Sequence, residues 1–234
     1  MKKIVLTVFA FAMLVSIFSC KGSTATGATG TTGANGPAVM IFQDGVAPYG
    51  SYSGGIDTFI DQNNSTRNFG ACDNARIGFY SDVYRYLVKF DLSPVLPSNV
   101  MVVKAYLTIN IYGGSGSPTI DAYKVTRSWT QGSGSYTSGA SSNNDATWED
   151  YTTSQAWSTA GGDYSTLIGS VMPGQQCTIS IDPATVQGWI SNPSGNYGML
   201  LKNRDETTGV SFTITDKFAT FSQRPILTIY YNLP

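Results

Sequence analysis

The sequence predicts an all-β fold, a jelly-roll β-sandwich of two antiparallel sheets with one short helix, over residues 39–234. Two observations lead to this prediction. Short runs of alternating apolar and polar residues recur along this part of the chain, and Gly, Ser and Asn separate them. Only one segment has the features of a helix. About 195 residues are enough to bury one core between two sheets.

The alternation is clearest in two consecutive segments. In residues 84–92, Tyr84, Tyr86 and Val88 point to one face, whereas Arg85 and Lys89 point to the other. Residues 101–111 repeat the pattern. The other predicted strands are residues 56–60, 75–80, 120–125, 177–181, 198–202, 210–215 and 226–231, which gives about nine strands in all.

The predicted helix follows Asp182, which can cap its first turn, and Pro183 suits the first helical position. It covers residues 183–190, a turn or two. Residues 131–146 form a long polar loop, and loops of this length tend to be functional or disordered.

Residues 1–19 have the pattern of an export signal. Lys2 and Lys3 precede 15 uncharged residues, which as a helix would span about 22 Å, less than the roughly 30 Å of a bilayer core. Ser19-Cys20 resembles a bacterial lipobox, which implies that Cys20 is acylated and anchors the protein to a membrane. The alternative is an ordinary signal peptide cleaved further on. Because Lys21 is not Asp, we expect an outer-membrane or cell-surface location.

Residues 20–38 are predicted to link the lipid to the domain. Glycines at 27, 30, 33 and 36 mark four G-x-y triplets, too few for a stable collagen helix. We interpret the segment as a flexible tether. A short trimerising stalk is the alternative, and the oligomeric state stays open.

Acylation of Cys20 would leave two thiols, Cys72 and Cys177, in a compartment where disulfides persist. They are predicted to form one bridge. The alternative is two separate buried thiols, because Cys177 falls in phase with Ile179 and Ile181 on an apolar strand face.

Composition excludes several classes of function. The chain has no His, which removes Ser-His-Asp, Cys-His and His-ligated zinc chemistry. The 14 Lys and Arg residues balance 15 Asp and Glu residues without basic runs, so we expect no nucleic-acid partner. Only 12% of residues are charged, about half the usual share, and uncharged polar groups must keep the surface soluble.

An ordered set of motifs resembles the DNRLRE domain, a jelly-roll module of secreted and surface-anchored microbial proteins. The motifs are IDTFID (56–61), NFG and ARIG (68–78), RYLVKFDLS (85–93), KAYLTINIY (104–112), Trp129, ATWEDY with Trp157 and AGGDY (146–164), ATVQGWI (184–190), NYGMLLK (196–202) and RPILTIYY (224–231). The resemblance implies this fold, and some members are assigned to an alginate-binding family. We expect a single module without the catalytic domains that often accompany this family.

Carbohydrate binding is the chemistry that the outward residues suggest. Arg76, Arg85 and Lys89 would form a cationic strip if they share one sheet, suited to uronate carboxylates. Tyr106 and Tyr136 are the candidate aromatic platforms. The alternative is a solvated face whose charges prevent edge-to-edge aggregation. The four Trp residues are expected to close the ends of the core.

Acidic residues suggest two further possibilities. Asp57, Asp61 and Asp216 lie at predicted strand ends and could hold one structural calcium ion. Acids at 145, 149, 150 and 163 could in principle act as a glycosidase pair, but are expected instead to accept loop N–H bonds or bind calcium. We therefore expect no enzymatic activity.

Together these features predict a non-catalytic surface lipoprotein that binds polysaccharide, with anionic glycan preferred. The alternative is a structural or adhesive component of an envelope or matrix. An exposed aromatic beside Arg85 and Lys89 in a groove would favour binding, whereas pairing of these cations with acids on a flat face would favour the structural role.

Overall fold

The computed structural model describes residues 36–93, 95–114, 116, 118–136, 145–173, 176–207, 209, 211–216 and 219–234. Its strands are β1 (Ala38–Phe42), β2 (Gly55–Asp61), β3 (Asn74–Phe79), β4 (Val83–Phe90), β5 (Met101–Gly114), β6 (Ile120–Val125), β7 (Asp150–Thr152), β8 (Gln155–Ala156), β9 (Tyr164–Val171), β10 (Gln176–Ile181), β11 (Met199–Asn203), β12 (Ser211–Thr215) and β13 (Ile226–Asn232). The helical elements are α1 (Pro183–Ser191) and the short 3₁₀ turns η1 (Pro193–Gly195) and η2 (Phe221–Gln223).

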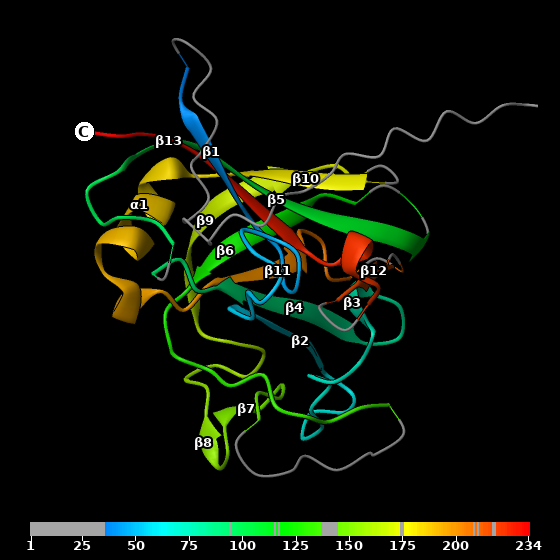
Figure 1. Cartoon of the computed structure of the whole chain (residues 1–234). Helices are drawn as coiled ribbons and strands as arrows, with labels where there is room; N and C mark the ends of the chain where they lie inside the picture. The colour runs from blue at the N-terminus through cyan, green and yellow to red at the C-terminus, as the bar shows by residue number, and fades with distance from the viewer. Residues whose placement is uncertain are drawn as a thin grey trace, which may run out of the picture.

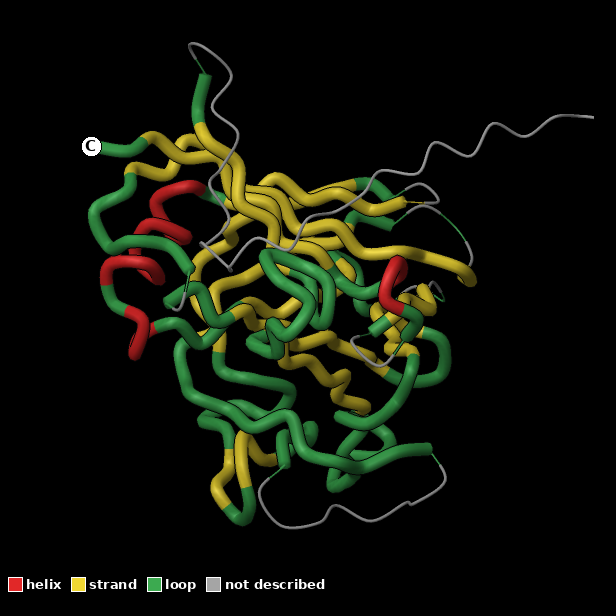
Figure 2. The backbone as a smooth tube through the Cα atoms, viewed as in Figure 1, coloured by secondary structure: helices red, strands yellow, loops and turns green. Residues whose placement is uncertain are grey.

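Antiparallel strands make up almost all of the regular structure, as Figure 2 shows in yellow, and the predicted all-β sandwich is confirmed. One layer contains β1, β13, β5 and β10, with β13 between β1 and β5. The other contains β12, β3, β4, β11, β6 and β9, with β2 also paired to β4. The two layers form one curled sheet, because β5 belongs to both.

The passage of β5 between the layers depends on an irregularity. Thr213 of β12 pairs with Gly113, but the next residue, Ile214, pairs with Ile111. Tyr112 is therefore the extra residue of a β-bulge. Bulges bend a strand and increase its twist, which lets one strand serve both layers.

The main core lies between the two layers. Large apolar side chains from both fill it, and those of Tyr86, Phe42, Leu107, Ile179 and Ile77 are fully buried. Helix α1 covers one end and contributes Val186, Trp189 and Ile190. Asp182 caps this helix by accepting N–H bonds from Ala184 and Thr185, as predicted.

A second core lies on the other side of β4. It contains Ile60, Val83, Leu87, Val125, Trp129, Ala146, Trp148, Trp157 and Leu200. The chain between β6 and β9 covers this face and carries the small β7–β8 hairpin, which hangs below β2 and β4 in Figure 1. The second core explains why Trp129, Trp148 and Trp157 are buried. Both faces of β4 are therefore buried over much of its length.

The N-terminal predictions fall outside the described residues. The signal peptide of residues 1–19, the acylated Cys20 and nearly all of the linker belong to this part. Strand β1 begins at Ala38, the last residue of the predicted linker. Within the part that the structure describes, no helix is long and apolar enough to cross a membrane.

Candidate functional site

Arg76 stands on the exposed surface of β3, opposite Thr213 of β12 in the strand register. Its guanidinium carbon lies 5.4 Å from the ring centroid of Tyr84 and 5.7 Å from that of Tyr136. Among the described residues its one hydrogen bond is long, with Nη1 donating to the Tyr84 hydroxyl at 3.5 Å. Cation–π contacts therefore hold the Arg76 side chain, and its fork has N–H groups left over for a ligand.

Tyr136 is fixed beside Arg76 by aromatic packing. Its ring centroid lies 5.7 Å from that of Phe59 and 5.6 Å from that of Phe69, and these two phenylalanines stack at 4.3 Å. Its hydroxyl donates to Asn74 Oδ1 at 3.3 Å. Burial raises the pKa of the Tyr136 phenol, so it stays neutral at physiological pH. The ring is nevertheless 42% exposed, enough to present an edge to a ligand.

A hollow of about 330 Å³ opens beside Arg76. It is lined by Arg76, Tyr80, Tyr84, Gly114, Ser211 and Thr213. Tyr80 is 75% exposed in the turn between β3 and β4. The hollow thus combines a cation, aromatic rings and hydroxyl groups, the combination that binds sugars. We call Arg76, Tyr80, Tyr84 and Tyr136 the Arg76 site.

No acid neutralises Arg76 at short range. None of the four ion pairs among the described residues involves it. Partial burial acts to lower the pKa of Arg76, but neighbouring groups that include Tyr136 and Asp61 raise it above its ordinary value. The guanidinium is therefore permanently charged, and its planar fork can receive a carboxylate.

Arg85 has a different environment from the one predicted. It forms a bidentate pair with Glu206, at 2.8 Å from Nε and 2.9 Å from Nη2, and Nη1 donates to the Gly161 carbonyl at 2.7 Å. Its guanidinium lies 4.8 Å from the Trp148 ring, and only 13% of its side chain is exposed. Arg85 therefore fastens the second core's covering chain to β4, and its placement on an open cationic strip is wrong.

A second hollow, of about 520 Å³, lies beside Arg85 and is lined partly by Arg127, Asp163 and Tyr164. Its charges are satisfied internally. Arg127 Nε donates to Asp163 at 2.8 Å, and the backbone N–H groups of Ser158 and Thr159 donate to the same carboxylate. These bonds lower the pKa of Asp163, although burial opposes the shift. Asp163 thus shapes this loop, in agreement with its expected role.

Lys89 and Tyr106 do not join the Arg76 site. Lys89 lies on β4 opposite Ile56, at half-buried exposure. Tyr106 lies on the part of β5 that belongs to the other layer, where its ring contacts Tyr230 edge-on at 6.0 Å. Of the five predicted carbohydrate-binding residues, the structure brings together Arg76 and Tyr136.

The three acids predicted to bind calcium have other contacts. Asp57 accepts a 2.6 Å hydrogen bond from the buried Tyr86 hydroxyl. Asp61 accepts N–H bonds from the turn that follows it, at Asn63 and Asn64. Asp216 is fully buried. The described residues contain no group of three or more acidic, Cys or His side chains that could hold a metal, so the structure does not gather Asp57, Asp61 and Asp216 into one cluster.

Cys72 and Cys177 are both buried, and both are free thiols in the structure. Cys177 faces the core from β10, as do Ile179 and Ile181. This is the second of the two alternatives left open by the sequence, rather than the bridge.

Two of the acids considered as a glycosidase pair differ in exposure. Glu149 is exposed and accepts a hydrogen bond from the Ser65 hydroxyl at 2.6 Å, whereas Asp145 is buried.

Sequence reasoning missed Tyr80 and Tyr84 as parts of the site. Tyr84 was assigned to the buried face of its strand, and it is buried, but its hydroxyl reaches Arg76 at the surface. The sequence itself indicated that the face of β4 that carries Arg85 is covered. Leu87 and Val83 share its face of β4, and two apolar residues on a supposedly solvated face indicate that something covers it.

No model of a known protein family matches the chain, and a search of curated proteins finds no significant match. The geometry of the site therefore carries the functional argument.

Proposed function

We propose that this protein is a non-catalytic polysaccharide-binding module that prefers anionic glycans, held on the outer membrane or cell surface by a lipid at Cys20. The observation that carries the proposal is Arg76, an exposed arginine outside every described ion pair and flanked by tyrosines. Its fork suits a uronate carboxylate, and the tyrosine rings suit the apolar faces of sugars. The DNRLRE-like motif order supports the same ligand class.

The structural or adhesive role remains the second candidate, because Arg85 is paired with Glu206. Pairing of this cation with an acid is what we expect of a structural role rather than of a binding site. Only Arg76 separates the two candidates. A purely structural module would tolerate its replacement, whereas a glycan-binding module would not.

The test is a glycan array on the purified full chain, with alginate and polygalacturonate among the targets. Arg76→Gln should weaken binding roughly ten- to hundredfold, the range of a hydrogen-bonded charge contact. Arg76→Lys should recover only part of the loss, because an ammonium group cannot form the two parallel bonds.

Lys104→Gln provides the matched control, since it removes one exposed cation from β5 in the other layer. It should leave binding unchanged. Absence of binding to any glycan by the wild-type chain, or equal effects of the two Gln variants, would move the assignment to the structural role.

A further inference from the structure

We infer that the Arg76 site is one end of a longer groove, which takes an extended segment of polysaccharide across β3, β12 and β5, with a carboxylate at Arg76 and uncharged sugar at Tyr112. This inference rests on the proposed function and deepens it. It concerns the length and charge pattern of the ligand.

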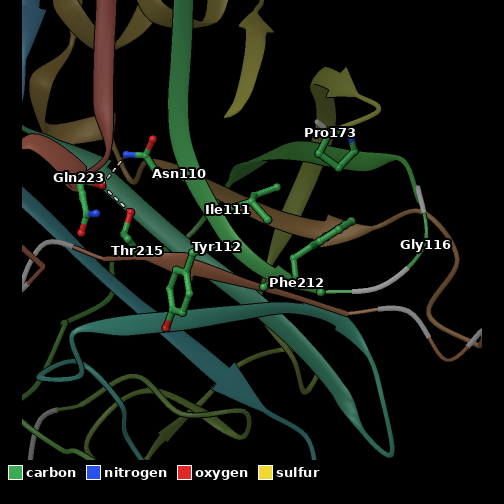
Figure 3. Close-up of a pocket in the computed structure, with 10 residues that line it drawn as sticks. Asn110, Ile111, Tyr112, Gly116, Pro173, Phe212, Thr215 and Gln223 are labelled. Atoms are coloured by element: carbon green, nitrogen blue, oxygen red, sulfur yellow. Dashed lines mark hydrogen bonds between the residues drawn. The ribbon is translucent and has the colours of Figure 1, made fainter. Parts of the chain in front are cut away.

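The groove continues because a larger hollow adjoins the Arg76 site. This hollow measures about 610 Å³ and is lined in part by Asn110, Tyr112, Thr215 and Gln223 (Figure 3). It shares Gly114 with the Arg76 hollow. Thr213 and Thr215 lie two residues apart on one face of β12, and Thr213 lines the Arg76 hollow whereas Thr215 lines the larger one.

The strand register gives the groove its direction. Thr213 pairs with Arg76 on one side and with Gly113 on the other, so a line from Arg76 to Gly113 crosses three hydrogen-bonded strands. Two strand spacings amount to about 10 Å. A single sugar unit placed at Arg76 would leave the Tyr112 end empty.

Tyr112 is aimed outward by the bulge. As the unpaired residue of β5 it is 60% exposed, although its strand neighbours are held in the sheet. It lies near Arg76, whose charge acts to lower its pKa, while burial and Asp73 raise that pKa overall. Bulges often redirect a side chain at functional positions, and an exposed phenol ring offers a stacking face to a sugar.

The Tyr112 end of the groove is polar and uncharged. Asn110 Nδ2 donates to the Gln223 carbonyl at 2.9 Å, and Thr215 donates its hydroxyl to the same oxygen, as the dashed lines in Figure 3 show. These bonds fix the wall of the hollow. None of the described residues that line it is charged, so this end favours a neutral unit or an esterified uronate over a second carboxylate.

Gly113 keeps the two hollows connected. A Cβ atom there would lie 3.6 Å from Thr213 Oγ1, an ordinary contact, so any side chain at this position would enter the groove without straining the backbone. A large residue at Gly113 should therefore block the passage between the hollows and leave each hollow intact.

The experiment measures affinity for partially methyl-esterified oligogalacturonides of increasing length, from the free monosaccharide upward. For the wild type, affinity should rise until the ligand spans both hollows. Tyr112→Ala and Gly113→Leu should each abolish this rise, about five- to tenfold for the longer ligands, and leave the shortest ligands unaffected. Arg76→Gln should weaken all lengths equally.

Controls and outcomes separate this inference from the proposed function. Tyr49→Ala removes another exposed tyrosine and Gly188→Leu adds a side chain in open space on α1, and both should keep the wild-type length dependence. If Tyr112→Ala and Gly113→Leu keep the length dependence while Arg76→Gln weakens binding, the extended groove is overturned and the proposed function is preserved. No binding of any oligomer by the wild type would overturn both.

A second arm tests the charge pattern with polygalacturonate of graded methyl esterification. Partial esterification should raise affinity modestly, because one carboxylate per bound segment satisfies Arg76 and the uncharged end then receives a neutral unit. Affinity that falls in proportion to the remaining carboxylates would contradict the uncharged end of the groove.

Discussion

Arg76 and Arg85 lie on the neighbouring strands β3 and β4, but among the described residues Arg76 donates only one long hydrogen bond, to the Tyr84 hydroxyl. Arg85 donates three short hydrogen bonds to Glu206 and Gly161. A ligand carboxylate at Arg85 would have to displace a partner already bound in bidentate form. The same residue type thus serves recognition at one position and structure at the other, according to its partners.

The two buried thiols give a prediction about reactivity. Burial raises the pKa of Cys72 to about 11 and that of Cys177 to about 12. Because the thiolate is the reactive species, both should resist iodoacetamide at neutral pH in the folded protein and react after unfolding without reductant. Peptide mass spectrometry measures both states. Protection that persists in denaturant until a reductant is added would indicate the disulfide instead.

Site residues were predictable from the sequence only as far as strand parity determines them. Parity places Arg76 on the outer face, and the isolated Tyr136 in a polar loop was a sound candidate for an exposed aromatic. Parity cannot show that the chain from β6 to β9 folds back over Arg85, since that contact joins residues 76 positions apart. Nor can it anticipate the bulge that exposes Tyr112.

At the scale of elements, Glu206 joins three parts of the chain. It binds Arg85 of β4 and, at 2.8 Å, Lys202 of β11, while Arg85 in turn holds the Gly161 loop. Burial acts to raise the pKa of Glu206, but the bonds from Arg85 and Lys202 outweigh it and lower the pKa. The carboxylate is therefore ionised and contributes to folding stability over most of the pH range.

Glu206→Gln should lower the free energy of unfolding at pH 7 by about 2 kcal/mol, because two partly buried cations lose their shared charge. A lowered folded-state pKa contributes stability above the unfolded pKa, near 4.3, and the contribution disappears as the pH falls through the folded value. The difference between variant and wild type should therefore shrink below about pH 4.

Urea titrations at several pH values measure this difference. Asp205→Asn is the neighbouring control, since Asp205 is exposed on the same turn. An effect of Glu206→Gln that is small at pH 7, or that grows in acid, would show that the Arg85–Glu206–Lys202 contacts do not stabilise the fold.

Most elements followed from the sequence, and the missed ones have physical reasons. The nine predicted strand ranges all coincide with strands, and the helix after Asp182 is confirmed. Strand β9 was missed because it has little apolar alternation, with Leu167 47% exposed and Ile168 buried. Strand β1 is a five-residue apolar run beside a Gly-rich segment, and it is defined by its pairing with the distant β13.

At the scale of the whole molecule, the start of β1 and the C-terminus lie at the top of Figure 1, and the β7–β8 hairpin lies at the bottom, beyond the layer that contains β4. A lipid-anchored tether would join the domain at β1.

The lipid itself is testable. Cys20→Ser should move the protein from the membrane fraction to the soluble fraction, because the acyl chains supply the apolar area that holds it there. Fractionation with immunodetection measures the distribution, and Cys72→Ala, a change at a buried thiol, should keep the wild-type location. Persistence of Cys20→Ser in the membrane fraction would indicate a different mode of attachment.

The position of β13 between β1 and β5 has a consequence for biogenesis. Tyr231 pairs with Ala38 on one side and with Val102 on the other, so β1 lacks its strand partner and β5 lacks its partner on that edge until residues 226–232 are available. A chain that crosses a membrane N-terminus first would therefore lack a complete sheet for most of its transit. Such late closure suits a translocation channel that passes only unfolded polypeptide. Pairing of β13 with β1 and β5 would then complete the sheet after the chain has crossed the membrane.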